Sequence, residues 1–149
     1  MNKYILDTNI ISYIEMDSIL GDKIKSKLEY LSDDDIVCTS IITLFEMEYG
    51  INLNTNIKIQ DKIKKAMYFT QKYLSIIPLD IKEVSIFGNI KSKYLKSTGI
   101  DKNIIKKHNL DLLLASTAIS ENAILISNDK IFEKLSKIEP NLKYENWLK

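Results

Sequence analysis

The sequence predicts an α/β fold of three layers, in which helices cover both faces of a central parallel sheet. Short apolar runs without turn residues recur along the chain, which is typical of buried strands. Longer helical patterns separate these runs, and such alternation indicates βαβ units with parallel strands. The chain has 149 residues, of which 45% are hydrophobic and 28% charged. We therefore expect a single domain over residues 1–149 with a sizeable core.

The first forty residues predict a strand, two helices and a second strand. The apolar run Tyr4–Leu6 indicates the first strand. Helical patterns follow at Ile10–Ile14 and Ile24–Leu31, with a turn expected over Met16–Asp22 between them. Ile36–Thr39 is largely apolar and rich in β-branched residues, so it is expected to form the second strand.

A helix is expected next, from about Ile41 to Tyr49, with Gly50 as its C-terminal cap. Its sequence is apolar on nearly all sides, so we expect it to be largely buried. Glu46 and Glu48 interrupt this apolar character. Because a buried carboxylate is costly unless it is paired or binds a cation, at least one of them is expected to have a function.

The middle of the chain predicts helix, strand, helix and loop. Ile57–Leu74 has the spacing of an amphipathic helix, and Ser75–Leu79 that of a short strand. A second helix is expected over Ile81–Leu95, broken by Gly99. Lys96–His108 is expected to be a polar, basic loop.

The last forty residues complete the pattern. A helix is expected from Asn109, its N-cap, with Asp111 in its first turn. Ala123–Ser127 is an apolar strand that ends in Asn128 and Asp129, as the first strand ends in Asp7. The tail, residues 140–149, is expected to add a final short strand.

Charge is distributed unevenly along the chain. The formal net charge is +1, but residues 58–107 hold twelve lysines and four acids, a balance of +8 that leaves −7 for the rest. This basic middle favours a polyanionic partner, although lysine-rich helices also simply solvate themselves. There is no arginine. Lysine contacts phosphate as a point charge, so we expect nucleic-acid binding to be salt-sensitive and weakly sequence-specific.

Several classes of protein are disfavoured by what the sequence lacks. No apolar run approaches the length of a membrane span and the N-terminus does not resemble a signal peptide, so we expect a cytoplasmic protein. Cys38 is the only cysteine, which excludes an internal disulfide and suggests an inert core thiol. A nucleophilic pair with His108, the only histidine, has no other support.

Four acids are placed where a parallel sheet could bring them together. Asp7 and Asp129 follow separate strands, Glu46 lies in the apolar helix and Asp111 opens another helix. Such positions can all reach the carboxyl edge of the sheet, where ligands collect in α/β folds. Simpler explanations stay open: Asp7 is a favourable helix cap, and Asp111 is stabilised by the dipole of its helix.

A site built from these acids predicts divalent-metal chemistry. Clustered carboxylates repel one another, and a hard cation relieves that repulsion. All-oxygen ligands favour Mg²⁺ or Mn²⁺, whereas zinc would need more Cys and His ligands than this chain has. A carboxylate-bound cation acidifies bound water and stabilises charge on a phosphoryl group, so metal-assisted phosphodiester hydrolysis is predicted. There is no glycine-rich phosphate loop.

The whole chain resembles the PIN-domain ribonucleases, and among them the VapC-type toxins of toxin–antitoxin pairs. The resemblance is carried by Leu-Asp-Thr-Asn (6–9), Ser-Ile-Ile-Thr-Leu-Phe-Glu-Met-Glu-Tyr-Gly (40–50), Asp-Leu-Leu-Leu-Ala-Ser-Thr-Ala (111–118), Ile-Ser-Asn-Asp-Lys-Ile-Phe (126–132) and Glu-Asn-Trp (145–147). It selects Glu46, four residues before Gly50, as the functional glutamate rather than Glu48. One departure is Ser116, where the family usually has a second alanine.

The resemblance implies a site, an activity and partners. The residues that match the family's acidic metal-binding positions are Asp7, Glu46, Asp111 and Asp129. Those that match its small polar supporters are Thr8 or Asn9, and Ser127 or Asn128. The implied activity is Mg²⁺-dependent cleavage of structured RNA, often tRNA or rRNA, by metal-activated water. The implied partners are a second copy of the chain and an antitoxin whose tail covers the acidic pocket.

Two questions stay open at this level. The chain could be an RNA-processing PIN nuclease without an antitoxin, or a binding module for RNA or protein that keeps the fold; the presence of all four acids argues against the module. The absence of arginine also leaves the RNA contacts to lysines, for which we select Lys102, Lys106 and Lys107, in the segment before Asp111.

Overall fold

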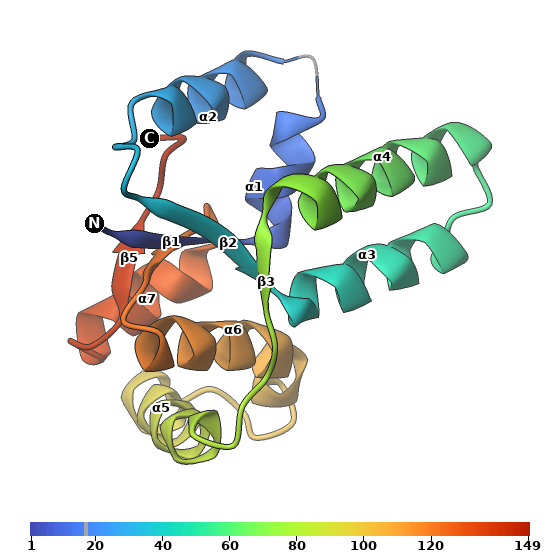
Figure 1. Cartoon of the computed structure of the whole chain (residues 1–149). Helices are drawn as coiled ribbons and strands as arrows, with labels where there is room; N and C mark the ends of the chain where they lie inside the picture. The colour runs from blue at the N-terminus through green and yellow to red at the C-terminus, as the bar shows by residue number, and fades with distance from the viewer. Residues whose placement is uncertain (17) are drawn as a thin grey trace.

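The computed structural model describes residues 1–16 and 18–149. Its centre is a five-stranded sheet with the order β3-β2-β1-β4-β5, in which every neighbouring pair is parallel (Figure 1). The strands are β1 Lys3–Leu6, β2 Ile36–Ser40, β3 Ser75–Ile77, β4 Ile124–Ile126 and β5 Lys143–Glu145. The predicted parallel sheet is confirmed, including the short strand in the tail.

Helices connect the strands and form the two outer layers. They are α1 Thr8–Ile14, α2 Ile19–Glu29, α3 Ile41–Leu53, α4 Ile57–Tyr73, α5 Glu83–Thr98, α6 Asn109–Ser120 and α7 Lys130–Ile138, with a 3₁₀-helix, η1, at Ile105–His108. Parallel strands need such crossover connections, because a tight turn cannot return the chain to the same edge.

The two faces of the sheet carry separate cores. Adjacent residues of β1 point to opposite faces: Ile5 packs in the core formed with α5, α6 and α7, and Leu6 in the core formed with α1, α2 and α4. Figure 1 shows α5 and α6 together on one side of the sheet. Trp147 packs on the second face, with its ring 5.7 Å from that of Tyr4. The predicted three-layer arrangement is therefore confirmed.

The strand order places a switch point between β1 and β4. The chain passes from β1 outward to β2 and β3, and then returns to β4 on the other side of β1. Leu6 and Ile126 are paired in register, and the backbone N–H of Asp7 donates to the Ile126 carbonyl at 3.0 Å. Ligands of open α/β sheets bind at the carboxyl side of such a switch point. The residues that follow Leu6 and Ile126 lie there.

The helix predicted over residues 41–49 differs from expectation in length and burial. α3 continues to Leu53, and Gly50 lies inside it rather than at its end. A Cβ at this position would lie 3.2 Å from Ile63 Cδ1 of α4, so glycine permits the close approach of the two helices. Of its apolar residues, Phe45 and Tyr49 are 65% and 67% exposed. The expectation of a largely buried helix is wrong, because α3 and α4 pair with each other and extend beyond the sheet (Figure 1).

The segment predicted as a loop over residues 96–108 is partly helical. α5 continues to Thr98 and ends at Gly99, whose φ of 64° suits glycine. η1 follows, and its Ile105 is buried. His108, not Asn109, occupies the N-cap position of α6. The turn expected over residues 16–22 includes residue 17, which lies outside the described residues, and α2 already begins at Ile19.

Cys38 is a buried thiol whose S–H lies 3.1 Å from the Tyr4 carbonyl, and burial raises its pKa to about 11. His108 contacts Asp111 instead of Cys38. The structure thus agrees with an inert core cysteine. Among the described helices, none combines the length and the apolar character needed to cross a bilayer.

Candidate active site

Asp7 lies at the end of β1, where it is only 7% exposed. It is the N-cap of α1, and its Oδ1 accepts a hydrogen bond from the Thr8 backbone N–H at 2.7 Å. Its Oδ2 accepts from the Ser127 hydroxyl, also at 2.7 Å. Burial raises the pKa of Asp7 to about 7 against these two hydrogen bonds, and the nearby Glu46 and Asp111 carboxylates raise it further. Asp7 is therefore both a helix cap and a carboxylate whose ionisation is unfavourable.

Glu46 reaches the same edge from α3. Its Oε1 accepts from the Thr8 hydroxyl at 2.7 Å. Burial raises the pKa of Glu46, and the nearby Asp111 carboxylate raises it further. The Thr8 hydrogen bond lowers this pKa. Glu48, by contrast, is exposed and accepts from Asn52 Nδ2 on its own helix at 3.0 Å. Of the two glutamates, Glu46 is the one that contacts Thr8 beside Asp7, and its role in the site stays a prediction.

A chain of hydroxyl groups that the sequence did not reveal supports Glu46. The Thr8 hydroxyl lies 3.2 Å from that of Thr43, which in turn lies 3.0 Å from that of Thr39. Thr39 donates to the Leu6 carbonyl at 2.7 Å. Thr39 and Thr43 are fully buried. Thr39 lies at the end of β2 and Thr43 in the first turn of α3, so their contact depends on how the strand turns into the helix.

Asp111 lies in the first turn of α6, as predicted. Its Oδ2 is 3.2 Å from Nδ1 of His108. Burial raises the pKa of Asp111, the His108 hydrogen bond opposes this, and the Asp129 carboxylate raises it. His108 was not selected from the sequence as a residue of this site, although it precedes Asp111 by three residues, a spacing that brings helical side chains together.

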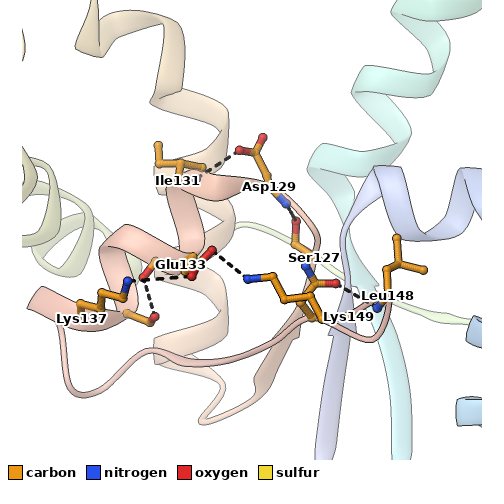
Figure 2. A network of polar contacts seen from close by, with 9 residues as sticks. Ser127, Asp129, Ile131, Glu133, Lys137, Leu148 and Lys149 are labelled. Atoms are coloured by element: carbon orange, nitrogen blue, oxygen red, sulfur yellow. Dashed lines mark hydrogen bonds and ion pairs between the residues drawn. The ribbon is translucent and has the colours of Figure 1, made fainter.

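Asp129 is exposed and caps α7, with its Oδ1 accepting from the Ile131 backbone N–H at 3.1 Å. Figure 2 shows this carboxylate at the beginning of the helix, beside Ser127. The same view shows Glu133 of α7 bound to Lys149, 3.1 Å between Oε2 and Nζ, which ties the C-terminus to the helix. Asp129 itself is held by its cap hydrogen bond and by its backbone N–H, which donates to the Ser127 hydroxyl.

Ser127 connects several of these groups. Its fully buried hydroxyl donates to Asp7 and accepts from the Asp129 backbone N–H at 3.0 Å and from Asn9 Nδ2 at 3.4 Å. Asn9 Oδ1 is buried and has no hydrogen-bond partner in the described part of the chain. Asn128 is half-buried, and we find no side-chain hydrogen bond for it among the described residues. Of the predicted supporters, Thr8, Asn9 and Ser127 contact the acidic groups or one another.

The donor set suits a hard divalent cation. Glu46, Asp111 and Asp129 each have one carboxylate oxygen held by a hydrogen-bond donor, and among the described residues the other oxygen has no hydrogen-bond partner. Asn9 Oδ1 adds a neutral oxygen without a partner, and oxygen ligands are those that Mg²⁺ and Mn²⁺ prefer. Within residues 1–16 and 18–149, however, no three acidic, His or Cys side chains lie close enough to form a ready-made metal site. The four carboxylates are therefore neighbours at one edge of the sheet, but they do not converge on a single point.

The selected lysines belong to the segment that leads into α6. Lys102 precedes η1, and Lys106 and Lys107 belong to it; all three are exposed. Lys106 Nζ is 3.4 Å from Asn103 Oδ1. These lysines precede Asp111 in the sequence, and their contact with RNA stays a prediction.

The family model described as PIN domain matches residues 4–138 of this chain. The chain belongs to the PIN-domain family. That membership confirms the resemblance read from the motifs, and it agrees with the parallel sheet and with the acids at its carboxyl edge.

Relatives identify the branch of the family. Ribonuclease VapC2 of Rickettsia felis is 33% identical over 145 residues, 97% of each chain. Ribonuclease VapC2 of Haemophilus influenzae is 32% identical over 154 residues, covering 99% of this chain and all of that protein. The PIN domain described above is thus of the VapC kind.

Solved structures lead to the same branch. The crystal structure of VapBC2 from Rickettsia felis, bound to a DNA fragment from their promoter, matches with a TM-score of 0.76 and 30% identity over 97% of this chain and 98% of that one. VapBC-1 from nontypeable Haemophilus influenzae matches with a TM-score of 0.73 over 99% of both chains. At 24% identity, the second match supports the PIN fold alone.

Proposed function

We propose that this PIN domain is an endoribonuclease that hydrolyses RNA phosphodiester bonds with the help of Mg²⁺, or Mn²⁺ in its place, and that it is the toxin of a toxin–antitoxin pair. One observation carries the metal-dependent chemistry. A buried carboxylate, Asp7, lies at the switch point of the sheet with a pKa raised to about 7, close to Glu46 and Asp111. A divalent cation is what removes the cost of ionising such a group.

The chain's own residues have distinct parts in this proposal. Asp7, Glu46, Asp111 and Asp129 are the residues that would hold the cation through their carboxylate oxygens. Thr8 and Ser127 orient two of these carboxylates through hydrogen bonds of 2.7 Å. When bound, the cation acidifies a water molecule, the nucleophile, and offsets charge on the phosphoryl group.

Structured RNA, such as tRNA or rRNA, is the proposed substrate, and the cytoplasm is the proposed location. The exposed side chains of Lys102, Lys106 and Lys107 lie in the segment that runs into Asp111. There they would hold the RNA backbone next to the acids. Because lysine is a point charge without the planar fork of arginine, these contacts would be weakly sequence-specific.

The proposed protein partners are an antitoxin and a second copy of the chain. The VapBC2 name of the matching Rickettsia felis structure supports the antitoxin. An apolar hollow of about 260 Å³ between α1, α3 and α4, lined in part by Met47, Ile63 and Ala66, offers it a place to dock. On α3, Phe45, Tyr49 and Leu53 form a stripe, each residue more than 60% exposed, that would be covered in a homodimer.

Cleavage of RNA by the purified protein tests the activity. We expect cutting with Mg²⁺ or Mn²⁺ and none in excess EDTA. Undiminished cutting in the chelator would exclude the metal mechanism. Binding of RNA without cleavage under any metal condition would instead favour a binding module on the same fold.

Co-purification of a small protein that inhibits cleavage would separate the toxin from an RNA-processing PIN nuclease. The protein is expressed with its neighbouring genes and isolated without denaturant. An inhibitory partner supports the toxin, whereas full activity in a complex-free preparation from native cells supports the processing enzyme.

A further inference from the structure

Asp111 differs from the other three acids in how its carboxylate is held. Asp7 and Asp129 accept from backbone N–H groups that follow them, and Glu46 accepts from a threonine hydroxyl. Asp111 accepts from the imidazole of His108, across 3.2 Å between Nδ1 and Oδ2. The orientation of Asp111 therefore depends on how the imidazole itself is fixed.

The ring of His108 is fixed from α5. It meets the ring of Tyr94 edge-on, with centroids 6.4 Å apart and an interplanar angle of 61°. Tyr94 is 4% exposed and belongs to the core, so it is a rigid support. Beside it, Lys91 Nζ donates to Asn109 Oδ1 at 2.7 Å and ties the start of α6 to the same helix.

His108 stands where η1 runs directly into α6. The Asn109 backbone N–H there donates to the Lys106 carbonyl, and the φ of −98° and ψ of 10° at His108 are not the extended backbone of a side-chain cap. The side chain of His108 makes no capping hydrogen bond, and its Nδ1 faces Asp111 instead.

We propose that His108 is a positioning residue for Asp111. Its Nδ1–H holds Oδ2 and leaves Oδ1 of Asp111 available as a ligand. The hydrogen on Nδ1 is present in the protonated ring and in the matching neutral tautomer, so the contact does not require a charged imidazole. The inference rests on the proposed metal-dependent function, and groups that orient metal ligands in this way commonly change metal affinity 10–100-fold when removed.

Two substitutions separate the hydrogen bond from the packing. His108→Phe keeps a ring against Tyr94 and removes the donor. His108→Asn removes the ring and keeps an N–H at about the position of Nδ1. Both leave the four acids unchanged. Thermal melting in EDTA establishes that each variant is folded at the temperature of the binding measurement.

The measured quantity is the affinity of the free protein for Mn²⁺, followed by electron paramagnetic resonance, with RNA cleavage measured alongside. We expect His108→Phe to weaken Mn²⁺ binding about 10–100-fold, and His108→Asn to stay within a few-fold of the parent. Cleavage by His108→Phe should recover as Mn²⁺ is raised, with the KM for RNA unchanged. A residue that only packs would not produce this rescue.

Either of two results overturns the role of His108. His108→Phe could bind Mn²⁺ as tightly as the parent, or both variants could lose the same affinity while remaining folded. In these cases the parent still binds Mn²⁺ and cuts RNA, so the proposed function stands. A parent protein that binds no Mn²⁺ and cuts no RNA overturns the proposed function, and the role of His108 with it.

Discussion

Replacing Asp7 with Asn tests the central feature of the site, because it removes the charge and keeps the shape. The pKa of Asp7 in the folded protein is about 7, against 3.8 for an unperturbed group. Between these values the folded protein retains a proton that the unfolded chain releases. The folded protein therefore loses stability relative to the unfolded chain as pH rises from about 4 through 7. Above pH 7 the full cost of ionising Asp7 is present.

The size of this cost follows from the pKa difference. A gap of about three pH units corresponds to at most about 4 kcal/mol at pH 8, at 1.36 kcal/mol per unit. Asp7→Asn does not recover this whole free energy. The variant has weaker hydrogen bonds in place of two charge-assisted ones, and its NH₂ group faces a donor. Each of these three changes costs about 1 kcal/mol. We expect Asp7→Asn to stabilise the metal-free protein by on the order of 1 kcal/mol at pH 8 and by nothing measurable at pH 4.

The assay is unfolding of parent and variant in EDTA at pH 4 and pH 8, repeated at pH 8 with Mg²⁺. Mg²⁺ should raise the melting temperature of the parent by mass action and that of Asp7→Asn much less. RNA cleavage should be abolished. Asp22→Asn, at an exposed acid in the first turn of α2, is the control for loss of a carboxylate at a helix start.

Two results would refute this reasoning. A variant that is less stable than the parent at pH 8 in EDTA would mean that Asp7 contributes chiefly as a helix cap. An equal effect of Mg²⁺ on both proteins, or no effect on either, would mean that Asp7 is not a ligand of the cation.

Three further predictions follow from the site and its surroundings. Glu46→Gln should remove cleavage while Glu48→Gln leaves most of it, measured on the same RNA; equal losses would contradict the choice between the two glutamates. Replacing the three selected lysines with Ala should weaken RNA binding and flatten the slope of log affinity against log salt by about 2, since each phosphate contact contributes about 0.7 for single strands; an unchanged slope would leave them as solvated side chains. Tyr49→Lys, in the exposed stripe of α3, should shift the mass in solution from dimer to monomer, and an unchanged mass would exclude that face. The lysines concerned are Lys102, Lys106 and Lys107.

The parts of the site that could be predicted are those encoded by neighbouring residues. An apolar run followed at once by a polar turn predicts a strand end, so Asp7 and Asp129 could be located and their approach inferred from the parallel order of strands. Asp111 could be placed in the first turn of its helix because Asn109 predicts a helix start, although His108 occupies the N-cap position. These assignments depend on short-range patterns that tertiary packing did not overrule.

What could not be predicted depends on contacts between distant segments. The exposure of Phe45 and Tyr49 reflects where α3 projects relative to the sheet, and an apolar helix has the same sequence whether the protein core or a partner covers it. Gly50 predicts a helix end because glycine often caps helices, whereas in the structure its small size permits the contact with Ile63. His108 lies near Asp111 in sequence, but the Tyr94 ring that fixes it comes from another helix.

The arrangement of donors shows how the fold tolerates clustered carboxylates before a cation binds. Asp7, Asp111 and Asp129 stand at the starts of helices, where free backbone N–H groups and the helix dipole favour negative charge. These donors lower the cost of ionisation without removing it, since the pKa values of Asp7 and Asp111 stay raised. Full compensation would leave little for the cation to relieve and so little driving force for its binding. Because ionised Asp7 remains unfavourable without a cation, we expect its neutralisation to lower the affinity for the metal and to raise the stability of the metal-free protein.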